Sequence, residues 1–486
     1  MAQAGRHRRP EPGEVPDASG ETEHAADTSR AEETPSDTSN DAAGVGRPAP
    51  HTLALIAVPA AVVGIGSSLL LLGVSYLAGQ VQRFLWSWLP HAVGTTGSAW
   101  YWILGVLTVT GLAVGLVVRY VPGHAGPDPA TLGLVEPPMA VRILPSLLLA
   151  TVFVLAGGVS LGPENPITTA NVALACVLGA RAASGVPLPV WAGLAIGGTV
   201  GALFGTPVAA ALILSEFLAG GAGSKGTGSN GTGSNGTGSN RTGELWDRLF
   251  GPLVAAGAGS LTTLAFASPT LAINLPPYPG LRAIDLLSGT VIGVSAVALG
   301  LLLVEVFGWA HRVIGHLRAP VIRLTVAGVV LGLLGIAGGQ ITLFKGLDQM
   351  AVLANTVTTY SAGGLLVVAA VKIAALALSA ASGFPGGRIF PSIFIGVALG
   401  LLAGTLVPSV PMALAVATAT LGFLVAVTRS GWLSLFVAAA LTNDVVLFPL
   451  LCVVVLPVWL IATGRPELQA PKPVENPDVV AGTHRV

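Results

Sequence analysis

Two apolar stretches of this chain are each interrupted by a short segment rich in glycine and proline. The first, residues 157–166, reads GGVSLGPENP and holds one carboxylate, Glu164. The second, residues 381–391, reads ASGFPGGRIFP. At membrane depth such breaks are tolerated only where the freed backbone groups face protein or a water-filled cavity. A carboxylate there is costly unless it has a partner or a function. One interrupted segment in each half therefore points to a transport site between repeats.

A purely structural interpretation of these two segments is also open. They would be kinks at which helices pack together, and Glu164 would pair with a cation elsewhere in the chain. The occurrence of two such segments, one in each half, favours the site.

The composition is that of a membrane protein. Of the 486 residues, 52% are hydrophobic and 9% are charged, whereas soluble domains carry about 25% charged residues. The formal net charge is zero, so the chain has no bulk attraction for nucleic acid. Cys176 and Cys452 both lie in apolar runs, which favours packing roles over a disulfide, and two cysteines cannot make a four-ligand zinc site.

The sequence predicts no enzyme activity, no cofactor and no metal. It contains no Walker loop, no HExxH motif and no aspartate-rich motif for a diphosphate. An intramembrane enzyme or a structural scaffold is a further hypothesis, but it would need a second cluster of convergent acids or histidines.

The chain divides by composition into five parts. Residues 1–48 are polar and predict a disordered tail. Residues 49–218 and 244–464 predict two membrane repeats, separated by a low-complexity Gly/Ser/Thr/Asn linker over 219–243. Residues 465–486 form a polar C-terminal tail. Because basic residues outside the spans gather in the two tails, we expect both termini to be cytoplasmic, in a protein of the inner (plasma) membrane.

Charge-free runs predict the spans. Residues 52–82 and 102–118 are each about long enough to cross a bilayer. Residues 182–215 predict two short helices joined at FGTP, with Glu216 ending the second. Residues 389–428 are broken by prolines near their middle.

The spacing of the breaks indicates a repeat. Pro166 lies 41 residues before Pro207, and Pro391 lies 40 residues before Gly431. Each half therefore offers a broken loop, a second break and a short helix, as in transporters built from two related halves, often of inverted topology.

The breaks suit anion chemistry, because a helix N-terminus exposes unpaired amides and the positive end of the dipole. Pro391 suits an early helical turn, so amides near Arg388, Ile389 and Phe390 could face an anion. Amides near Pro127 could face it from another side.

Glu164 would lie at a third helix start, in the same positive field. When ionised it could take the anion position itself, and when protonated it could swing aside, which would make it both a gate and a proton carrier. His124 could be a proton relay, a ligand donor or a plain turn residue.

These motifs together resemble the CLC family of chloride channels and proton/chloride antiporters, over residues 51–466. SLGPENP resembles the family's GREGP loop and places Glu164 at the gating glutamate. GGRIFP resembles the GxFxP loop, which supplies anion-binding amides, and GHAGP resembles a degenerate GSGIP loop. FGTPVAAALILSE resembles the helix that follows the gate. In detail the motifs look most like a bacterial subgroup described as ion-transport proteins.

The resemblance implies an all-α polytopic membrane protein, with a CLC-like inverted repeat of broken and tilted helices and one pore in each subunit of a homodimer. It implies a channel or transporter for chloride or another small monovalent anion, with or without coupled protons, gated by a glutamate. The residues it implicates are the gate Glu164, a possible proton path at Glu216, and an anion-binding set of His124, Ala125, Gly126, Pro127, Arg388, Ile389 and Phe390.

Three positions depart from the family pattern. The anion-coordinating serine of the loop falls on His124, and the internal proton-transfer glutamate falls on Phe217, next to Glu216. The pore tyrosine falls near Leu468. These departures leave two alternatives to the main prediction: an obligate proton/anion antiporter with Glu216 as the relay, or a fluoride- or nitrate-selective relative.

Overall fold

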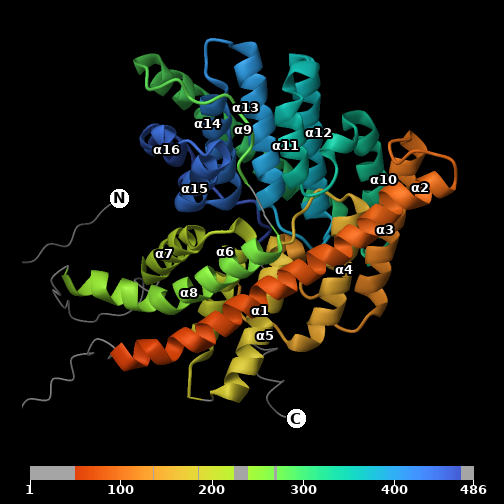
Figure 1. Cartoon of the computed structure of the whole chain (residues 1–486). Coiled ribbons are helices and arrows are strands. Elements are labelled where there is room, and N and C mark those ends of the chain that lie inside the picture. Colours follow the sequence, from red (N-terminus) through yellow and green to blue (C-terminus); the bar gives the residue numbers. More distant parts are fainter. Residues whose placement is uncertain (1–49, 135, 184, 224–238, 268–270, 472–486) are drawn as a thin grey trace, which may run out of the picture. The chain divides into compact units, whose positions relative to one another are not determined.

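The computed structural model describes residues 50–471, apart from residues 135, 184, 224–238 and 268–270 (Figure 1). The predicted N-terminal tail therefore lies outside the described residues, as do most of the predicted linker and the end of the C-terminal tail. The described residues form helices and connecting segments without a β-strand. This agrees with the all-α prediction.

The N-terminal half combines long helices with short ones. In chain order its elements are α1 (Pro50–Arg83), the π-helical turn η1 (Phe84–Trp88), α2 (Leu89–Ala92), α3 (Trp100–Tyr120), the 3-10 turns η2 (Pro129–Thr131) and η3 (Val141–Ile143), α4 (Leu144–Gly157), α5 (Glu164–Ala182), α6 (Leu188–Phe204) and α7 (Pro207–Gly223).

The C-terminal half has the same mixture. Its elements are α8 (Ser239–Phe266), α9 (Ala283–Ile314), α10 (Pro320–Gly338), η4 (Gln340–Thr342), α11 (Leu347–Asn355), η5 (Val357–Thr359), α12 (Ala362–Ala381), α13 (Ile389–Leu406), α14 (Met412–Thr428), α15 (Gly431–Thr442), η6 (Val445–Leu447) and α16 (Phe448–Ala462).

Eight of the helices in the described part are long and apolar enough to cross a membrane, among them α1, α3 and α9. The charge-free runs at 52–82 and 102–118 fall within α1 and α3, as predicted. The break between α6 and α7 also lies where the sequence predicts it. Gly205 ends α6 with a left-handed φ of 67°, which glycine adopts without steric cost. Pro207 then begins α7.

The predicted end of the second short helix at Glu216 differs from the structure. Helix α7 runs past Glu216 to Gly223, because the Glu216 carboxylate is accommodated by hydrogen bonds within the protein. The ends of the predicted linker belong to α7 and α8, and only residues 224–238 lie outside the described residues. The first part of the predicted C-terminal tail packs against the protein, where Leu468 is fully buried.

The two halves pack together through small residues. Helix α3 lies against α10, where a Cβ on Gly111 would overlap the carbonyl of Leu324 and a Cβ on Gly328 would overlap that of Leu107. Glycine at such a contact lets helix backbones approach closely, which is how helices in membranes commonly associate. Helices α13 and α14 lie in the interior of the described part, since most of their residues are buried. Helices α5 and α13 begin near one another and run in opposite directions (Figure 1).

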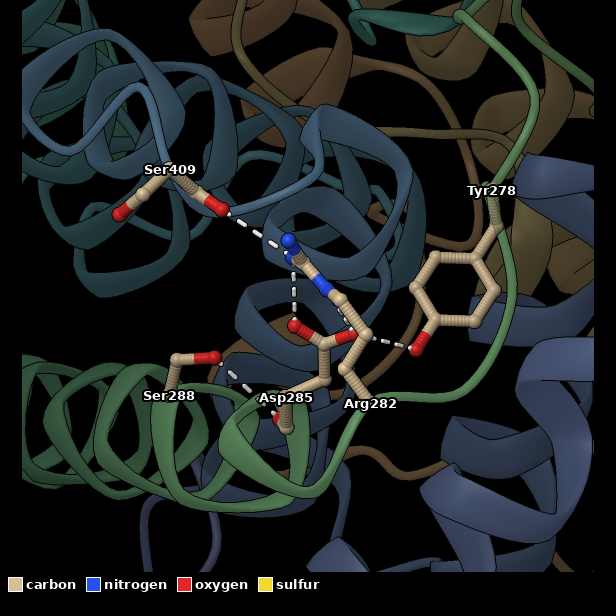
Figure 2. Close-up of polar contacts among 5 residues, drawn as sticks. All are labelled: Tyr278, Arg282, Asp285, Ser288 and Ser409. Carbon is tan, nitrogen blue, oxygen red and sulfur yellow. Dashed lines mark hydrogen bonds and ion pairs between the residues drawn. The ribbon is translucent and has the colours of Figure 1, made fainter.

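A polar cluster fixes the start of α9 (Figure 2). The buried Asp285 carboxylate accepts hydrogen bonds from the Tyr278 hydroxyl at 2.7 Å and from Arg282 at 2.7 and 3.0 Å. Arg282 also donates to the carbonyl of Ser409 at 3.1 Å, and the Tyr278 amide donates to Asp444 at 3.1 Å. This cluster therefore joins the segment before α9 to the α13–α14 connection and to the end of α15.

Candidate functional site

The two broken segments meet in an antiparallel bridge. The Gly162 amide donates to the carbonyl of Gly387 at 2.8 Å, and the Gly387 amide donates to that of Gly162 at 2.7 Å. A Cβ on either glycine would overlap the carboxylate of Glu164. A side chain at either position would displace the carboxylate, because the acid lies between the two backbones.

Glu164 is fully buried and is the first residue of α5. Its Oε1 accepts a hydrogen bond from the backbone amide of Phe390 at 2.7 Å, while its Oε2 has no hydrogen-bond partner among the described residues. The Phe390 amide lies at the start of α13, and the first amides of a helix have no carbonyl partner within that helix. The carboxylate thus occupies a position with the positive potential that attracts anions.

Helix α13 begins directly after the glycine break, with Pro391 in its first turn. Arg388 is the residue before the helix, and its side chain is largely buried. Its Nη2 donates to the carbonyls of Pro129, Ala130 and Leu132 at 3.0–3.1 Å. The residue that begins α13 therefore also holds the segment after the GHAGP loop.

A cavity of about 450 Å³ reaches this point from one side. Besides Arg388 and Ile389, it is lined by Leu132, Gly133, Leu134, Asn165, Ile213, Glu216, Val427, Thr428, Arg429, Ser430, Leu433 and Glu467. Because Ile389 precedes the Phe390 amide that bonds to Glu164, the cavity ends close to that carboxylate.

A second acid lies against a second helix start in the wall of this cavity. Glu216 accepts hydrogen bonds from the Ser430 hydroxyl at 2.5 Å and from the amides of Gly431 and Trp432 at 2.9 and 3.3 Å. These groups begin α15, so Glu216 caps that helix from α7. The carboxylate of Glu216 thus accepts from amides at the start of α15, as the carboxylate of Glu164 accepts from an amide at the start of α13.

The GHAGP loop lies at the edge of this arrangement. Its residues 123–126 all have positive φ, and the amide of Ala125 donates to the Ser146 hydroxyl at 3.0 Å. Ala125 is buried and lines a small second cavity that Asn165 and Gly386 also line. The side chains of His124 and Pro127 are exposed, and His124 Nδ1 lies 2.9 Å from the carbonyl of Val118.

The structure therefore brings Glu164, Arg388, Ile389 and Phe390 together, and brings Ala125 near the same helix starts. It places the His124 ring at the surface, and the larger cavity is lined by Leu132–Leu134 rather than by residues 124–127. The side chain of Phe217 lies outside the described residues. Leu468 is buried beside the cavity, with its amide donating to the carbonyl of Val427 at 3.2 Å.

Lys372 is a structural residue of the site that the motifs do not reveal. It is fully buried in α12 and donates to the carbonyls of Thr342, Leu343 and Phe344 at 2.7–3.1 Å. The Phe344 amide in turn donates to the carbonyl of Gly158 at 3.0 Å. Lys372 thus braces the segment before Glu164, and its signal in the sequence is a lone charge within an apolar run.

Comparison with known proteins gives three kinds of match. The family model described as "Voltage gated chloride channel" matches residues 108–461. The protein YfeO of Salmonella schwarzengrund (strain CVM19633), whose name assigns it to ion transport without naming an ion, is 47% identical over 423 residues, covering 87% of this chain and 98% of its own length. The YfeO of Salmonella paratyphi A matches to the same extent.

Two solved structures share the fold. A slow cyanobacterial Cl⁻/H⁺ antiporter superposes with a TM-score of 0.68 at 15% identity, covering 85% of this chain and 96% of its own. A CLC-type fluoride/proton antiporter superposes with a TM-score of 0.64 at 18% identity, covering 85% and 97%.

Proposed function

This chain belongs to the CLC family of voltage-gated chloride channels, and we propose that Glu164 is the gate through which it passes chloride or a related small anion across a membrane. The observation that carries the proposal is the 2.7 Å hydrogen bond from the Phe390 amide to Glu164 Oε1. A carboxylate held by backbone amides at a helix start occupies the place that a permeating anion would need.

The gate works by competition for that place. While Glu164 is ionised, its carboxylate bonds to the Phe390 amide and the anion path is closed. When Glu164 accepts a proton, it loses the charge that the start of α13 attracts. The neutral carboxyl then leaves, and an anion arriving from the cavity reaches the amides of Ile389 and Phe390.

Glu164→Gln tests this assignment. The amide side chain has no charge to compete with the anion, so anion efflux from liposomes that hold the pure protein should become independent of pH and at least as fast as in the wild type at low pH. Glu305→Gln, at an exposed acid of α9, is the matched control and should keep the wild-type pH profile. A pH profile that survives Glu164→Gln would show that another group gates the path.

A second candidate is strict proton/anion exchange with Glu216 as the internal relay. The position of Glu216 in the cavity wall supports it, as do the names of the two solved antiporters. A chloride gradient imposed on proteoliposomes should then drive proton movement uphill, and Glu216→Gln should abolish it while anion flux continues. Anion flux without proton pumping in the wild type would exclude this candidate. Parallel runs with chloride, fluoride and nitrate would establish which anion is preferred.

The remaining features of the assembly follow the same proposal. We place the protein in the inner (plasma) membrane with both termini in the cytoplasm, as a homodimer in which residues 49–218 and 244–464 are inverted repeats and each subunit has its own pore. Labelling of single cysteines introduced in the two tails, in intact and in permeabilised cells, measures the orientation. Cross-linking in native membranes measures the subunit number.

A further inference from the structure

The side chain of Arg388 is a buried cation next to the proposed gate. Only 9% of the residue is exposed, although it lies between the glycine break and α13. Its partners Pro129, Ala130 and Leu132 are bound through neutral carbonyls. These carbonyls carry no net charge, so the charge of the buried guanidinium is balanced by acids that act on it through space.

Part of the guanidinium is available to a further acceptor. All three side-chain hydrogen bonds of Arg388 in the described part of the chain leave from Nη2, whereas the N–H groups of an arginine side chain are distributed over Nε, Nη1 and Nη2. Arg388 also lines the cavity of about 450 Å³. An anion in this cavity therefore lies near the positive charge of Arg388, in a wall that also holds Glu216 and Glu467.

Three of the acids around Arg388 are held by hydrogen bonds to other groups. Glu164 bonds to the Phe390 amide, and Asp128 accepts from the Ala130 amide at 3.0 Å and lies 3.8 Å from His311 Nε2. Glu136 accepts from the Gly133 amide at 2.8 Å. Glu467 lines the same cavity as Arg388 and interacts with it electrostatically. Once Glu164 is neutralised, the balance of charge near Arg388 shifts towards the positive.

We propose that the Arg388 guanidinium is itself an anion-binding group, which holds the entering chloride or other small monovalent anion in the cavity. This inference rests on the proposed anion transport and adds to it a side chain that sets the affinity for the anion.

The test measures chloride binding to the purified full-length protein by isothermal titration calorimetry, with nitrate as a second probe. Arg388→Gln removes the charge and should weaken chloride binding by about tenfold or more, since a partly buried charge interacts strongly with a nearby ion. Arg388→Lys keeps the charge and should bind within about threefold of the wild type. Weakening by the same factor in both variants would mean that Arg388 acts only by holding residues 129–132, and would overturn the proposal.

Glu467→Gln tests the same idea without touching Arg388. Removing a negative charge from the cavity wall should tighten chloride binding by about twofold to fivefold. Unchanged or weaker binding in this variant would overturn the proposal even if Arg388→Gln does not fold. A wild-type protein that passes no anion at all would instead remove the proposed function, so the two failures are distinguishable.

Discussion

At the scale of single residues, the site depends on positions where a side chain is missing as much as on those where one is present. Gly162 and Gly387 bond to each other through their backbones, and Glu164 fills the space that their side chains would take. Lys372 and Arg388 each satisfy neighbouring carbonyls with a buried cation. The proposed gate is therefore shaped by close backbone approach, which only glycine permits.

Gly387→Ala should disable the gate without changing Glu164. The added methyl group would overlap the Glu164 carboxylate, so the carboxylate would have to leave the Phe390 amide. We expect anion efflux that no longer depends on pH, as for Glu164→Gln, together with a lower melting temperature. Gly257→Ala is the matched control, because a Cβ at Gly257 meets nothing within 4 Å. A wild-type pH profile for Gly387→Ala would contradict the proposed position of the gate.

At the scale of elements, the helices are positioned by polar groups at their ends. The carboxylate of Glu164 lies at the start of α13, the carboxylate of Glu216 caps α15, and Asp285 lies in the first turn of α9. Carboxylates at helix N-termini are favoured by the helix dipole. The first is the proposed gate, whereas the cluster of Tyr278, Arg282 and Asp285 has the form of a structural clasp (Figure 2).

The clasp predicts a loss of stability in alkali. Burial, together with the hydrogen bond to Asp285, raises the pKa of Tyr278 to about 12 from its ordinary value of 10.0. A group whose pKa is raised by folding contributes stability that is complete below its unfolded pKa and is lost as the pH rises through the folded pKa. The free energy of unfolding should therefore fall between about pH 10 and pH 12.

Tyr278→Phe should reduce that fall, because it removes the group that titrates. Denaturant unfolding in detergent at pH 9, 10, 11 and 12 measures the difference, and the ultraviolet absorbance of tyrosinate should show one fewer tyrosine ionising near pH 12. An identical fall in wild type and variant would mean that Tyr278 does not hold its proton in the way the structure implies.

At the scale of the whole molecule, the two halves are joined around the cavity by contacts between distant parts of the chain. The amide of Ala470 donates to the carbonyl of Ala130 at 2.8 Å, and the Gln469 side chain donates to that of Thr131 at 2.6 Å. Arg429 holds the same C-terminal segment through the carbonyls of Arg465 and Pro466. This segment thus carries Glu467, which lines the cavity.

Two truncated chains, one with residues 465–470 and one without them, test whether this segment stabilises the protein. A chain ending at residue 471 keeps the segment and is the matched control. A chain ending at residue 464 loses the buried Leu468, and deleting a buried leucine side chain alone typically costs about 2–5 kcal/mol. We expect it to melt several degrees lower and to lose most of its flux. Equal behaviour of the two truncations would show that the segment does not support the cavity.

Local sequence pattern determined the class of this protein and the position of its breaks. Charge-free runs of sufficient length predict membrane helices whatever the rest of the chain does. The prolines and glycines around Glu164 and Phe390 predict helix starts for reasons of backbone geometry that act within a few residues. The pairing of the two broken segments could be inferred from their symmetric placement. The resemblance to a known family identified Glu164 as the candidate gate.

Tertiary structure alone decided where the long side chains go. Arg388 bonds to carbonyls more than 250 positions earlier in the chain, and no local pattern carries that information. The same is true of Glu216, which lies within α7 and whose carboxylate accepts hydrogen bonds from Ser430 and Gly431. It is also true of His124, whose ring lies at the surface. Local composition sets which segments become helices, whereas the partners of a buried charge depend on which distant backbone groups the packed helices leave unsatisfied.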